Sequence, residues 1–354
     1  MCEFGKFPHL IFNRTPAYSA RYGPFYWNLA NMLYAAGKCL FQVDSPESFA
    51  SKIATMVDLF GDFLYSYDAS KWDTSLSRTL LEAEHQFVEK LLGIELPWLR
   101  FADDLRVFDE LGRCFDITAC RSTGQQNTSI GNAIISLLVY ATVHRAAGFI
   151  PDFDTVLVKG DDMAKFANVD PVNPELFCAL AYDLCGITYK LQAVGSISQV
   201  EVASQQVFDT SAASRQVRKA LQRGCWTINI TTSSPHFDQF VSDASLCQWY
   251  QNRFTPILGA FWRRIAELHA WSGARVTNPD PGVSRLLPTA LRSWASRGVN
   301  ISSHGRESFF IVSGISPRSQ VDFEHSILCA ATDAACYLGG MAALVHAYNL
   351  GYFV

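Results

Sequence analysis

Short apolar segments alternate with longer, helix-like segments over the first part of the chain. Residues 63–67 (FLYSY) form an apolar run that predicts a short buried strand. Residues 155–159 and 163–167 predict two more strands, which flank Gly160-Asp161-Asp162. A glycine in so short a connection predicts a tight hairpin in which this residue takes a positive φ. Further strands are expected at 188–191 and 201–208.

Helical patterns fill the intervals between these strands. Ser77 is expected to cap a helix that runs to about Leu92, and nearly uncharged residues 128–144 predict a long helix. Residues 173–185 predict another, and residues 97–119 contain a hairpin pattern with a turn near Gly112. After about residue 214 the pattern becomes mainly helical. The predicted class is therefore α+β, a mixed core followed by a helical segment.

Composition narrows the classes of protein without naming one. A chain that is 49% hydrophobic and 13% aromatic should fold around a sizeable core, which excludes a disordered tail. The net charge of -4 lacks the basic excess of many nucleic-acid binders. Ten scattered cysteines form no CxxC pair, and no signal peptide opens the chain, which fits a reducing cytosol. Residues 334–354 carry no Asp, Glu, Lys or Arg, yet their glycines favour a buried helix over a membrane span.

Acidic residues are the first candidates for chemistry. Asp161 and Asp162 are adjacent at a hairpin tip, where they repel each other unless a divalent cation neutralises them. A solvated acidic turn is the alternative. Asp68 follows the strand 63–67, and carboxylates from two strands can hold two Mg²⁺ ions about 3.5–4 Å apart. Asp73 lies beyond this strand, where it could contact a ribose or be an ordinary surface residue.

A polar stripe marks the helix expected at 128–144. Gly124 ends a flexible loop, and Thr128, Asn132 and Ser136 then recur every four residues on one face of the helix. Buried polar groups need hydrogen-bond partners. These partners could belong to a ligand or to a neighbouring backbone, and for Ser136 the backbone is the preferred interpretation.

The order of these segments resembles a known family. DxxxxD at 68–73, TGxxxTxxxN at 123–132 and GDD at 160–162 are similar to motifs A, B and C of RNA-dependent RNA polymerases of positive-strand RNA viruses. The sequences RTP at 14–16 and TGQQNTSIGN resemble the tombusvirus-like or nodavirus-like branch. Thr123 stands where the family usually has serine before the motif B glycine. This departure puts the details of loop motion in question.

The resemblance implies a right-hand polymerase with fingers, palm and thumb. The palm would hold an antiparallel sheet at residues 61–213, with a finger-like insertion at about 93–119. Residues 1–60 would be a remnant of the fingers and 214–354 a mainly helical thumb. The fingers would be largely missing, so the chain would be a fragment of a longer polyprotein or reading frame.

The resemblance also implies roles for the motif residues. Asp68 and Asp161 would bind two Mg²⁺ or Mn²⁺ ions, and Asp162 would support them. Asp73 and Asn132 would recognise the ribose 2′-hydroxyl. Thr128 would orient that pair, and Gly124 would let its loop adjust to the template and the incoming nucleotide.

Weaker matches lie on both sides of the three motifs. Lys6 and Arg14 resemble the basic residues of motif F, which hold the nucleotide triphosphate. Lys190 resembles the motif D lysine, which can protonate the leaving pyrophosphate, and residues 201–208 resemble motif E, which grips the primer. Surface lysines and arginines and an ordinary strand are the alternatives.

The function implied is RNA-directed RNA synthesis from ribonucleoside triphosphates on an RNA template with a primer or nascent strand. Other replicase segments upstream would be partners, in the host cytoplasm or in membrane-associated replication complexes, although membrane contact is not evident in the sequence. A reverse transcriptase is one alternative, but it tends to carry a bulky aromatic residue where Asp73 stands. A non-catalytic RNA-binding or scaffold fragment of a replicase is another.

Overall fold

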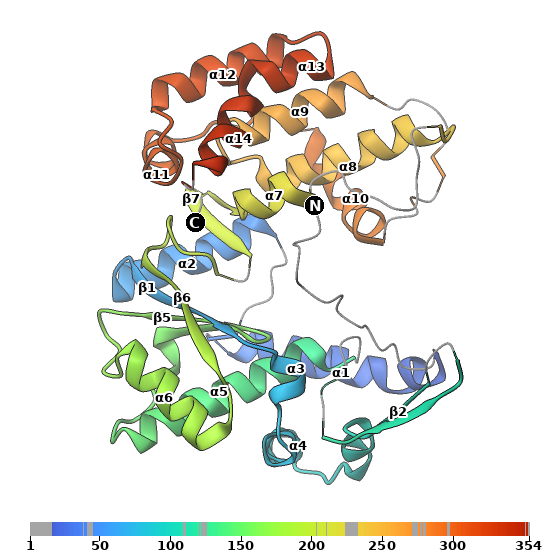
Figure 1. Cartoon of the computed structure of the whole chain (residues 1–354), viewed down its shortest axis with the longest axis vertical. Coiled ribbons are helices and arrows are strands. Elements are labelled where there is room, and N and C mark those ends of the chain that lie inside the picture. The colour runs from blue at the N-terminus through green and yellow to red at the C-terminus, as the bar shows by residue number, and fades with distance from the viewer. Residues whose placement is uncertain are drawn as a thin grey trace. The chain divides into compact units, whose positions relative to one another are not determined.

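The computed structural model comprises two compact units (Figure 1). Each unit has its own hydrophobic core. Unit 1 comprises residues 1–42 and 58–196, and unit 2 comprises residues 43–57 and 197–354. Within this division the predicted limits of fingers, palm and thumb stay predictions. The structure describes residues 16–37, 39–40, 45–108, 111–119, 121, 126–202, 204–209, 211–223, 233–270, 275–276, 278, 281–295, 298–350 and 352.

A four-stranded antiparallel sheet forms the centre of unit 1, with the strand order β4-β5-β1-β6. The strands predicted around Gly160 and at 63–67 are confirmed, while the last strand is longer than the predicted 188–191 because pairing with β1 continues to Ser196. The four strands are β1 (Phe63–Ala69), β4 (Val156–Lys159), β5 (Asp162–Phe166) and β6 (Tyr189–Ser196).

The two faces of this sheet have different surroundings. Side chains alternate between the faces along each strand. Tyr67 of β1 points to the face covered by helices, because its ring lies 5.0 Å from that of Phe177 in α6. The neighbouring Asp68 is exposed and belongs to the opposite face. At the other end of that opposite face, Phe166 packs against Phe60, with ring centroids 5.6 Å apart.

Helices of unit 1 begin and end at the residues that their sequences favour. The Ser77 hydroxyl accepts from the backbone N–H of Leu80 and caps α4 as predicted, and Asn173 caps α6 in the same way. The long helix predicted from residue 128 is confirmed as α5. The helical elements of this unit are α1 (Pro16–Ala36), α3 (Trp72–Ser75), α4 (Arg78–Leu92), η1 (Pro97–Ala102), α5 (Thr128–Ala146), η2 (Phe153–Thr155) and α6 (Pro174–Cys185).

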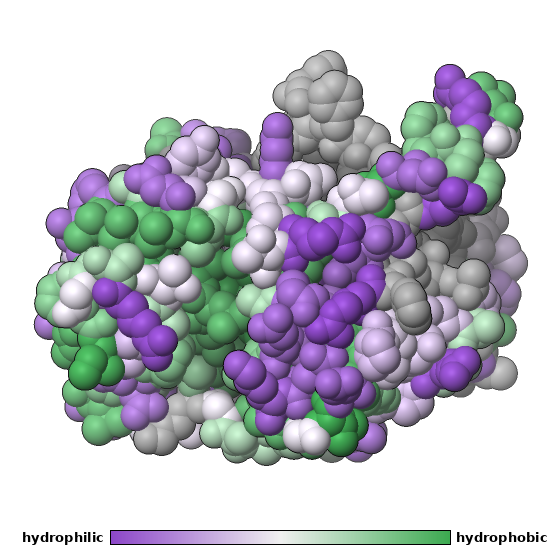
Figure 2. Space-filling view, turned by 90° about the horizontal axis from the view of Figure 1, so that it is seen from below, coloured by the Kyte–Doolittle hydropathy of each residue, from purple (hydrophilic) through white to green (hydrophobic). Residues whose placement is uncertain are grey.

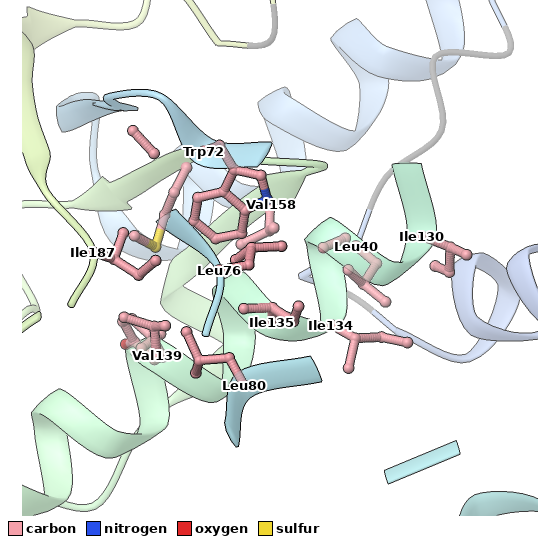
Figure 3. Packing of buried hydrophobic residues seen from close by; sticks show 14 of the residues in the cluster. Leu40, Trp72, Leu76, Leu80, Ile130, Ile134, Ile135, Val139, Val158 and Ile187 are labelled. Atoms are coloured by element: carbon pink, nitrogen blue, oxygen red, sulfur yellow. The ribbon is translucent and has the colours of Figure 1, made fainter. Parts of the chain in front are cut away.

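The core of unit 1 joins α5 to the sheet and to α4. Ile135 and Val139 of α5 are fully buried, and Figure 3 shows them near Leu80 of α4. Val158 of β4 and Trp72 of α3 belong to the same cluster. Such packing fixes α5 relative to the strands that carry the acidic residues, since truncating a core side chain to alanine typically costs about 2–5 kcal/mol.

The predicted hairpin at 97–119 is confirmed as two short strands, β2 (Leu105–Phe108) and β3 (Cys114–Ile117). Gly112 lies between them with a φ of 76°, as a turn glycine should. The hairpin forms its own two-stranded sheet within unit 1.

Unit 2 is mainly helical, as predicted for the end of the chain. Its hairpin begins at Gln205 instead of residue 201, because only an isolated bridge joins Val202 to Gln205. The ring of Phe208 packs edge-on against that of Phe309, 5.3 Å away. The elements are α2 (Pro46–Phe60), whose last residues join unit 1, β7 (Gln205–Asp209), β8 (Ala212–Arg215), α7 (Val217–Arg223), α8 (Phe237–Asn252), α9 (Leu258–Leu268), α10 (Pro281–Trp294), α11 (Ser303–Ser313), α12 (Pro317–Cys329), α13 (Asp333–Cys336), η3 (Tyr337–Met341) and α14 (Ala342–Asn349).

The uncharged C-terminal segment packs within unit 2. Cys336, Met341 and Leu344 are buried members of its core, but Leu338 and Leu350 are exposed. The predicted single buried helix is therefore wrong in part: the segment forms α13, η3 and α14, and only one side of it is buried. Among the described residues, no helix combines the length and apolar character that crossing a membrane needs.

Figure 2 shows one face of the molecule on which hydrophobic residues gather beside a strongly hydrophilic area. Exposed apolar residues such as Ile150 are normal on folded proteins and indicate no site by themselves.

Candidate active site

The hairpin between β4 and β5 carries the two adjacent aspartates. Gly160 has a φ of 63°, which confirms the positive φ predicted for this turn. The Ser136 hydroxyl of α5 donates a hydrogen bond of 3.0 Å to the Gly160 carbonyl, so the helix holds the turn. The preferred interpretation of Ser136 as a backbone partner is thereby confirmed. Asp162 is the first residue of β5, one position earlier than the predicted strand.

The register of the sheet brings Asp68 towards this hairpin. Asp68 lies within β1, since the strand continues to Ala69 instead of ending at residue 67 as predicted. Tyr67 pairs with Met163, so the next positions on the two strands are Asp68 and Asp162. Opposed residues of antiparallel strands share a face, with Cβ atoms about 4.5–5.5 Å apart. The two carboxylates therefore occupy the same end of the face opposite α5 and α6.

Lys190 occupies the other side of Asp68. The two residues are paired between β1 and β6, and both side chains are exposed. Cross-strand partners point to the same face of a sheet. The structure thus gathers one basic and two acidic positions, Lys190, Asp68 and Asp162, on three adjacent strands.

The acidic turn influences the half-buried Lys159 and the buried Tyr189. Burial lowers the pKa of Lys159, and the negative charge of Asp162 partly offsets this effect. Burial also raises the pKa of Tyr189, and the charge of Asp161 raises it further. A concentration of like charge at the turn favours the binding of a cation.

The donor chemistry of these carboxylates fits a hard divalent cation. Mg²⁺ is bound in proteins mainly through carboxylate oxygens and water, often by one or two carboxylates. In the part of the chain that the structure describes, no three His, Cys, Asp or Glu side chains are arranged as a metal-binding group. The two-metal site at Asp68, Asp161 and Asp162 therefore stays a prediction.

Asp73 is held beside the start of the motif B segment. It lies in α3, directly after Trp72, whose buried ring packs 6.2 Å from that of Tyr189. The Asp73 carbonyl accepts a hydrogen bond of 3.2 Å from the backbone N–H of Arg121. The backbone thus connects the end of motif A to the segment that leads into α5.

The polar stripe on α5 begins at the first residue of the helix. Thr128 is half-buried there, and Asn132 follows one turn later with 3% of its surface exposed. The Asn132 Oδ1 atom has no hydrogen-bond partner within the described part of the chain. Because a buried acceptor without a partner is costly, Asn132 is a good candidate for contact with a bound ligand.

Three predicted site residues lie outside the described residues. These are Lys6, Arg14 and Gly124. Their roles stay predictions. The remaining candidates, from Asp68 to Lys190, all belong to unit 1.

Sequence reasoning did not single out a buried ionic group beside α5. Glu84 of α4 forms an ion pair with Arg121 and accepts a hydrogen bond of 3.3 Å from Asn127 Nδ2. A signal was present in the sequence, since Glu84 lies four residues from both Leu80 and Val88 and so shares their apolar helix face. A charge on such a face requires a buried partner.

Carboxylates at one end of one face of an antiparallel sheet, with α5 and α6 packed on the other face, define the palm of a right-hand polymerase (Figure 1). Residues 33–334 match the family described as viral RNA dependent RNA polymerase. The chain belongs to this family.

Two curated relatives carry the name RNA-directed RNA polymerase. That of Tobacco necrosis virus (strain D) is 24% identical over 348 residues, which span 90% of this chain and 46% of the relative. That of Panicum mosaic virus (strain United States/Kansas 109S) is 25% identical over 190 residues, or 50% of this chain and 18% of the relative. The chain thus spans less than half the length of either relative.

Solved structures confirm the right-hand fold. The RNA-dependent RNA polymerase of a human picorbirnavirus, as an insertion loop deletion mutant, matches with a TM-score of 0.62 at 13% identity and covers 82% of this chain and 57% of that one. The Sicinivirus 3Dpol RNA dependent RNA polymerase matches with a TM-score of 0.55 at 13% identity, covering 77% and 59%.

Proposed function

We propose that this chain catalyses RNA-directed RNA synthesis. In this reaction the 3′-hydroxyl oxygen of an RNA strand attacks the α-phosphorus of a ribonucleoside triphosphate, a phosphodiester bond forms, and pyrophosphate leaves. The observation that carries the proposal is the β1–β5 register, which ends at Tyr67 and Met163; continued by one position, it sets Asp68 opposite Asp162 beside the Gly160-Asp161 turn. Membership of the polymerase family supports it.

In this proposal Asp68 and Asp161 hold two Mg²⁺ or Mn²⁺ ions, and Asp162 supports them. Bound ions would lower the pKa of the attacking hydroxyl and stabilise charge on the leaving group. Lys190 lies opposite Asp68 in the sheet register, from which it can approach the leaving pyrophosphate and donate a proton. The exposure of both side chains supports contact with a substrate from solvent.

The sugar of the incoming nucleotide is assigned to a different group of residues. Asn132 and Asp73 would hydrogen-bond the 2′-hydroxyl, and Thr128 would orient them. The buried Oδ1 of Asn132 supports this role, because a ribose hydroxyl would supply a donor to an atom that lacks one within the described chain. The proposed substrates are thus ribonucleotides, with an RNA template and a primer or nascent strand. We further propose that other replicase segments in the host cytoplasm act with it.

The test is RNA primer extension on an RNA template with Mg²⁺ or Mn²⁺. We expect Asp161→Ala to lower the rate roughly a hundredfold or more, because it removes charge stabilisation at the reacting phosphate. Asp183→Ala is the matched control, since Asp183 is an exposed aspartate of α6 on the helical side of the unit.

Equal extension by Asp161→Ala and the unmodified chain would contradict the proposal. RNA binding without any extension would favour a scaffold role. Extension with deoxyribonucleotides in preference to ribonucleotides would favour a reverse transcriptase.

A further inference from the structure

Glu84 is a buried acid that the proposed chemistry does not use. It is 3% exposed and lies on the face of α4 that carries Leu80 and Val88. A carboxylate in such surroundings is costly unless it is paired and hydrogen-bonded. Its contacts therefore show which parts of the molecule it holds together.

Two partners of Glu84 lie on either side of the motif B loop in sequence. One is the Arg121 guanidinium, which forms a buried ion pair with Glu84. The other is Asn127, the residue that precedes α5, whose Nδ2 donates to Glu84 Oε1 at 3.3 Å. Arg121 and Asn127 are each 3% exposed. One carboxylate thus binds residue 121 and the start of α5 at the same time.

Arg121 carries this connection further to Asp73. While its side chain binds Glu84, its backbone N–H donates to the Asp73 carbonyl at 3.2 Å. The chain of contacts from Glu84 therefore ends at one of the two residues assigned to the ribose hydroxyl.

The Glu84–Arg121 ion pair also lies against the turn of α5 that carries Asn132, the other residue assigned to the ribose hydroxyl. Gly131 precedes Asn132, and a Cβ atom at Gly131 would lie 2.9 Å from Arg121 Nη2 and 3.0 Å from the carboxyl carbon of Glu84. Real Cβ atoms essentially never lie under 3.0 Å from such a neighbour, so the ion pair would have to shift. Gly131 is therefore the residue that lets the ion pair approach α5 beside Asn132.

We propose that Glu84 is a positioning residue for ribose selection. Through Arg121 it fixes the backbone of Asp73, and through Asn127 and the surface of Gly131 it fixes the first turns of α5, including Asn132. Glu84 does not contact the nucleotide; it sets the separation of the two groups that do. The inference rests on the proposed polymerase activity and goes beyond the motif residues themselves.

The test compares Glu84→Gln with Glu89→Gln in the full 354-residue chain. Glutamine keeps the volume of Glu84 and can still accept from Asn127, but it removes the charge that holds Arg121. Glu89 is the matched control because it lies on the same helix and pairs with Arg100, 2.8 Å away, instead of Arg121. The readout is the ratio of kcat/KM for a ribonucleotide to that for its 2′-deoxy counterpart.

We expect Glu84→Gln to lower this ratio roughly tenfold, because displacements of about 1 Å can change rates on the order of a hundredfold. Glu89→Gln should leave the ratio unchanged. In the double variant Glu84→Gln with Asn132→Ala, the ratio should fall by less than the two single effects combined, since one of the two residues through which Glu84 acts is already missing. Additive effects would show that Glu84 has only a structural role and would overturn the inference.

Gly131→Ala gives a second way to test the inference if Glu84→Gln folds poorly. It displaces the ion pair without removing a charge, and it should also lower the ratio. An unchanged ratio in Glu84→Gln or in a folded Gly131→Ala would overturn the inference while Asp161→Ala stays inactive. Extension that does not depend on Asp161, or an inactive unmodified chain, would instead count against the polymerase proposal.

Discussion

Buried ionic groups hold the two ends of α5. They differ in the residues that they contact. At the N-terminal end, Glu84 binds Arg121 and Asn127, and Arg121 continues to Asp73. This group is directly connected to the residues assigned to the substrate. Burying it costs desolvation, and its value lies in the geometry that it fixes.

The group at the C-terminal end has no such connection. Asp170 lies with its Oδ2 atom 2.6 Å from Lys165 Nζ and its Oδ1 atom 3.1 Å from His144 Nε2. Lys165 Nζ also lies 4.2 Å from the centroid of the Phe177 ring. His144 follows Asn132 by twelve residues, about 18 Å along the helix axis. This group therefore joins β5 to the far end of α5, away from the proposed sugar site.

The comparison separates two uses of a buried charge. Burying either group costs free energy, because the attraction between two charges removed from water rarely offsets the full desolvation cost. A group that only stabilises the fold should affect unfolding and leave sugar selection unchanged. A group that positions substrate contacts should affect selection as well.

Removing the acid at the C-terminal end should have the largest effect on stability. We expect Asp170→Ala to lower the free energy of unfolding by about 3–5 kcal/mol, because it leaves the fully buried Lys165 ammonium without its carboxylate. Denaturant unfolding measures this change. The ratio of ribonucleotide to deoxyribonucleotide use should stay that of the unmodified chain.

Asp183→Ala again serves as the control for loss of an aspartate, since Asp183 is exposed on α6. Its effect on the free energy of unfolding should be within about 0.5 kcal/mol. If Asp170→Ala is no more destabilising than this control, the buried pair with Lys165 contributes little. If it changes the sugar ratio, the separation between the two ends of α5 is wrong.

A change of pH should have an effect of intermediate size on stability, through a group near the N-terminal end of α5. Burial raises the pKa of Asp103 to about 7, and this carboxyl lies 3.6 Å from His85 Nε2. Between about pH 4 and pH 7 the folded state keeps a proton that the unfolded state has released. This group's contribution to stability is therefore present at low pH and is lost as the pH rises through 7.

Asp103→Asn should remove this pH dependence. Relative to the unmodified chain, the variant should gain roughly 2–4 kcal/mol of stability between pH 4 and pH 8. Thermal or denaturant unfolding at both pH values gives the difference. Asp104→Asn is the control, because Asp104 is exposed and pairs with Arg78 at the surface. An Asp103→Asn effect that is the same at both pH values would contradict the assignment.

The sequence predicted those parts of the site that depend on local pattern. Gly160 between two apolar runs predicted the positive φ, and the four-residue spacing of Thr128, Asn132 and Ser136 predicted their shared helix face. Both features are set within one or two turns of chain. The helix cap at Ser77 was predictable for the same reason.

The buried ionic groups could not be predicted as pairs. Glu84 and Arg121 are 37 residues apart, and nothing local selects one among several arginines as the partner. The limits of strands also depended on pairing: β1 includes Asp68 because β6 continues the ladder to Tyr189. Such details arise from tertiary contacts, which override local propensity.

The smallest effect should come from an ion pair that is exposed instead of buried. Arg106 and Asp116 are opposed across the β2–β3 hairpin with 2.8 Å between Nε and Oδ1, and their side chains are 67% and 62% exposed. A double-mutant cycle with Arg106→Ala and Asp116→Ala should give a coupling energy of about 0.2–1 kcal/mol, which salt weakens. A coupling as large as the Asp170→Ala effect would show that pairing matters more than burial. In that case the contrast between the two ends of α5 could not rest on the desolvation of their charges.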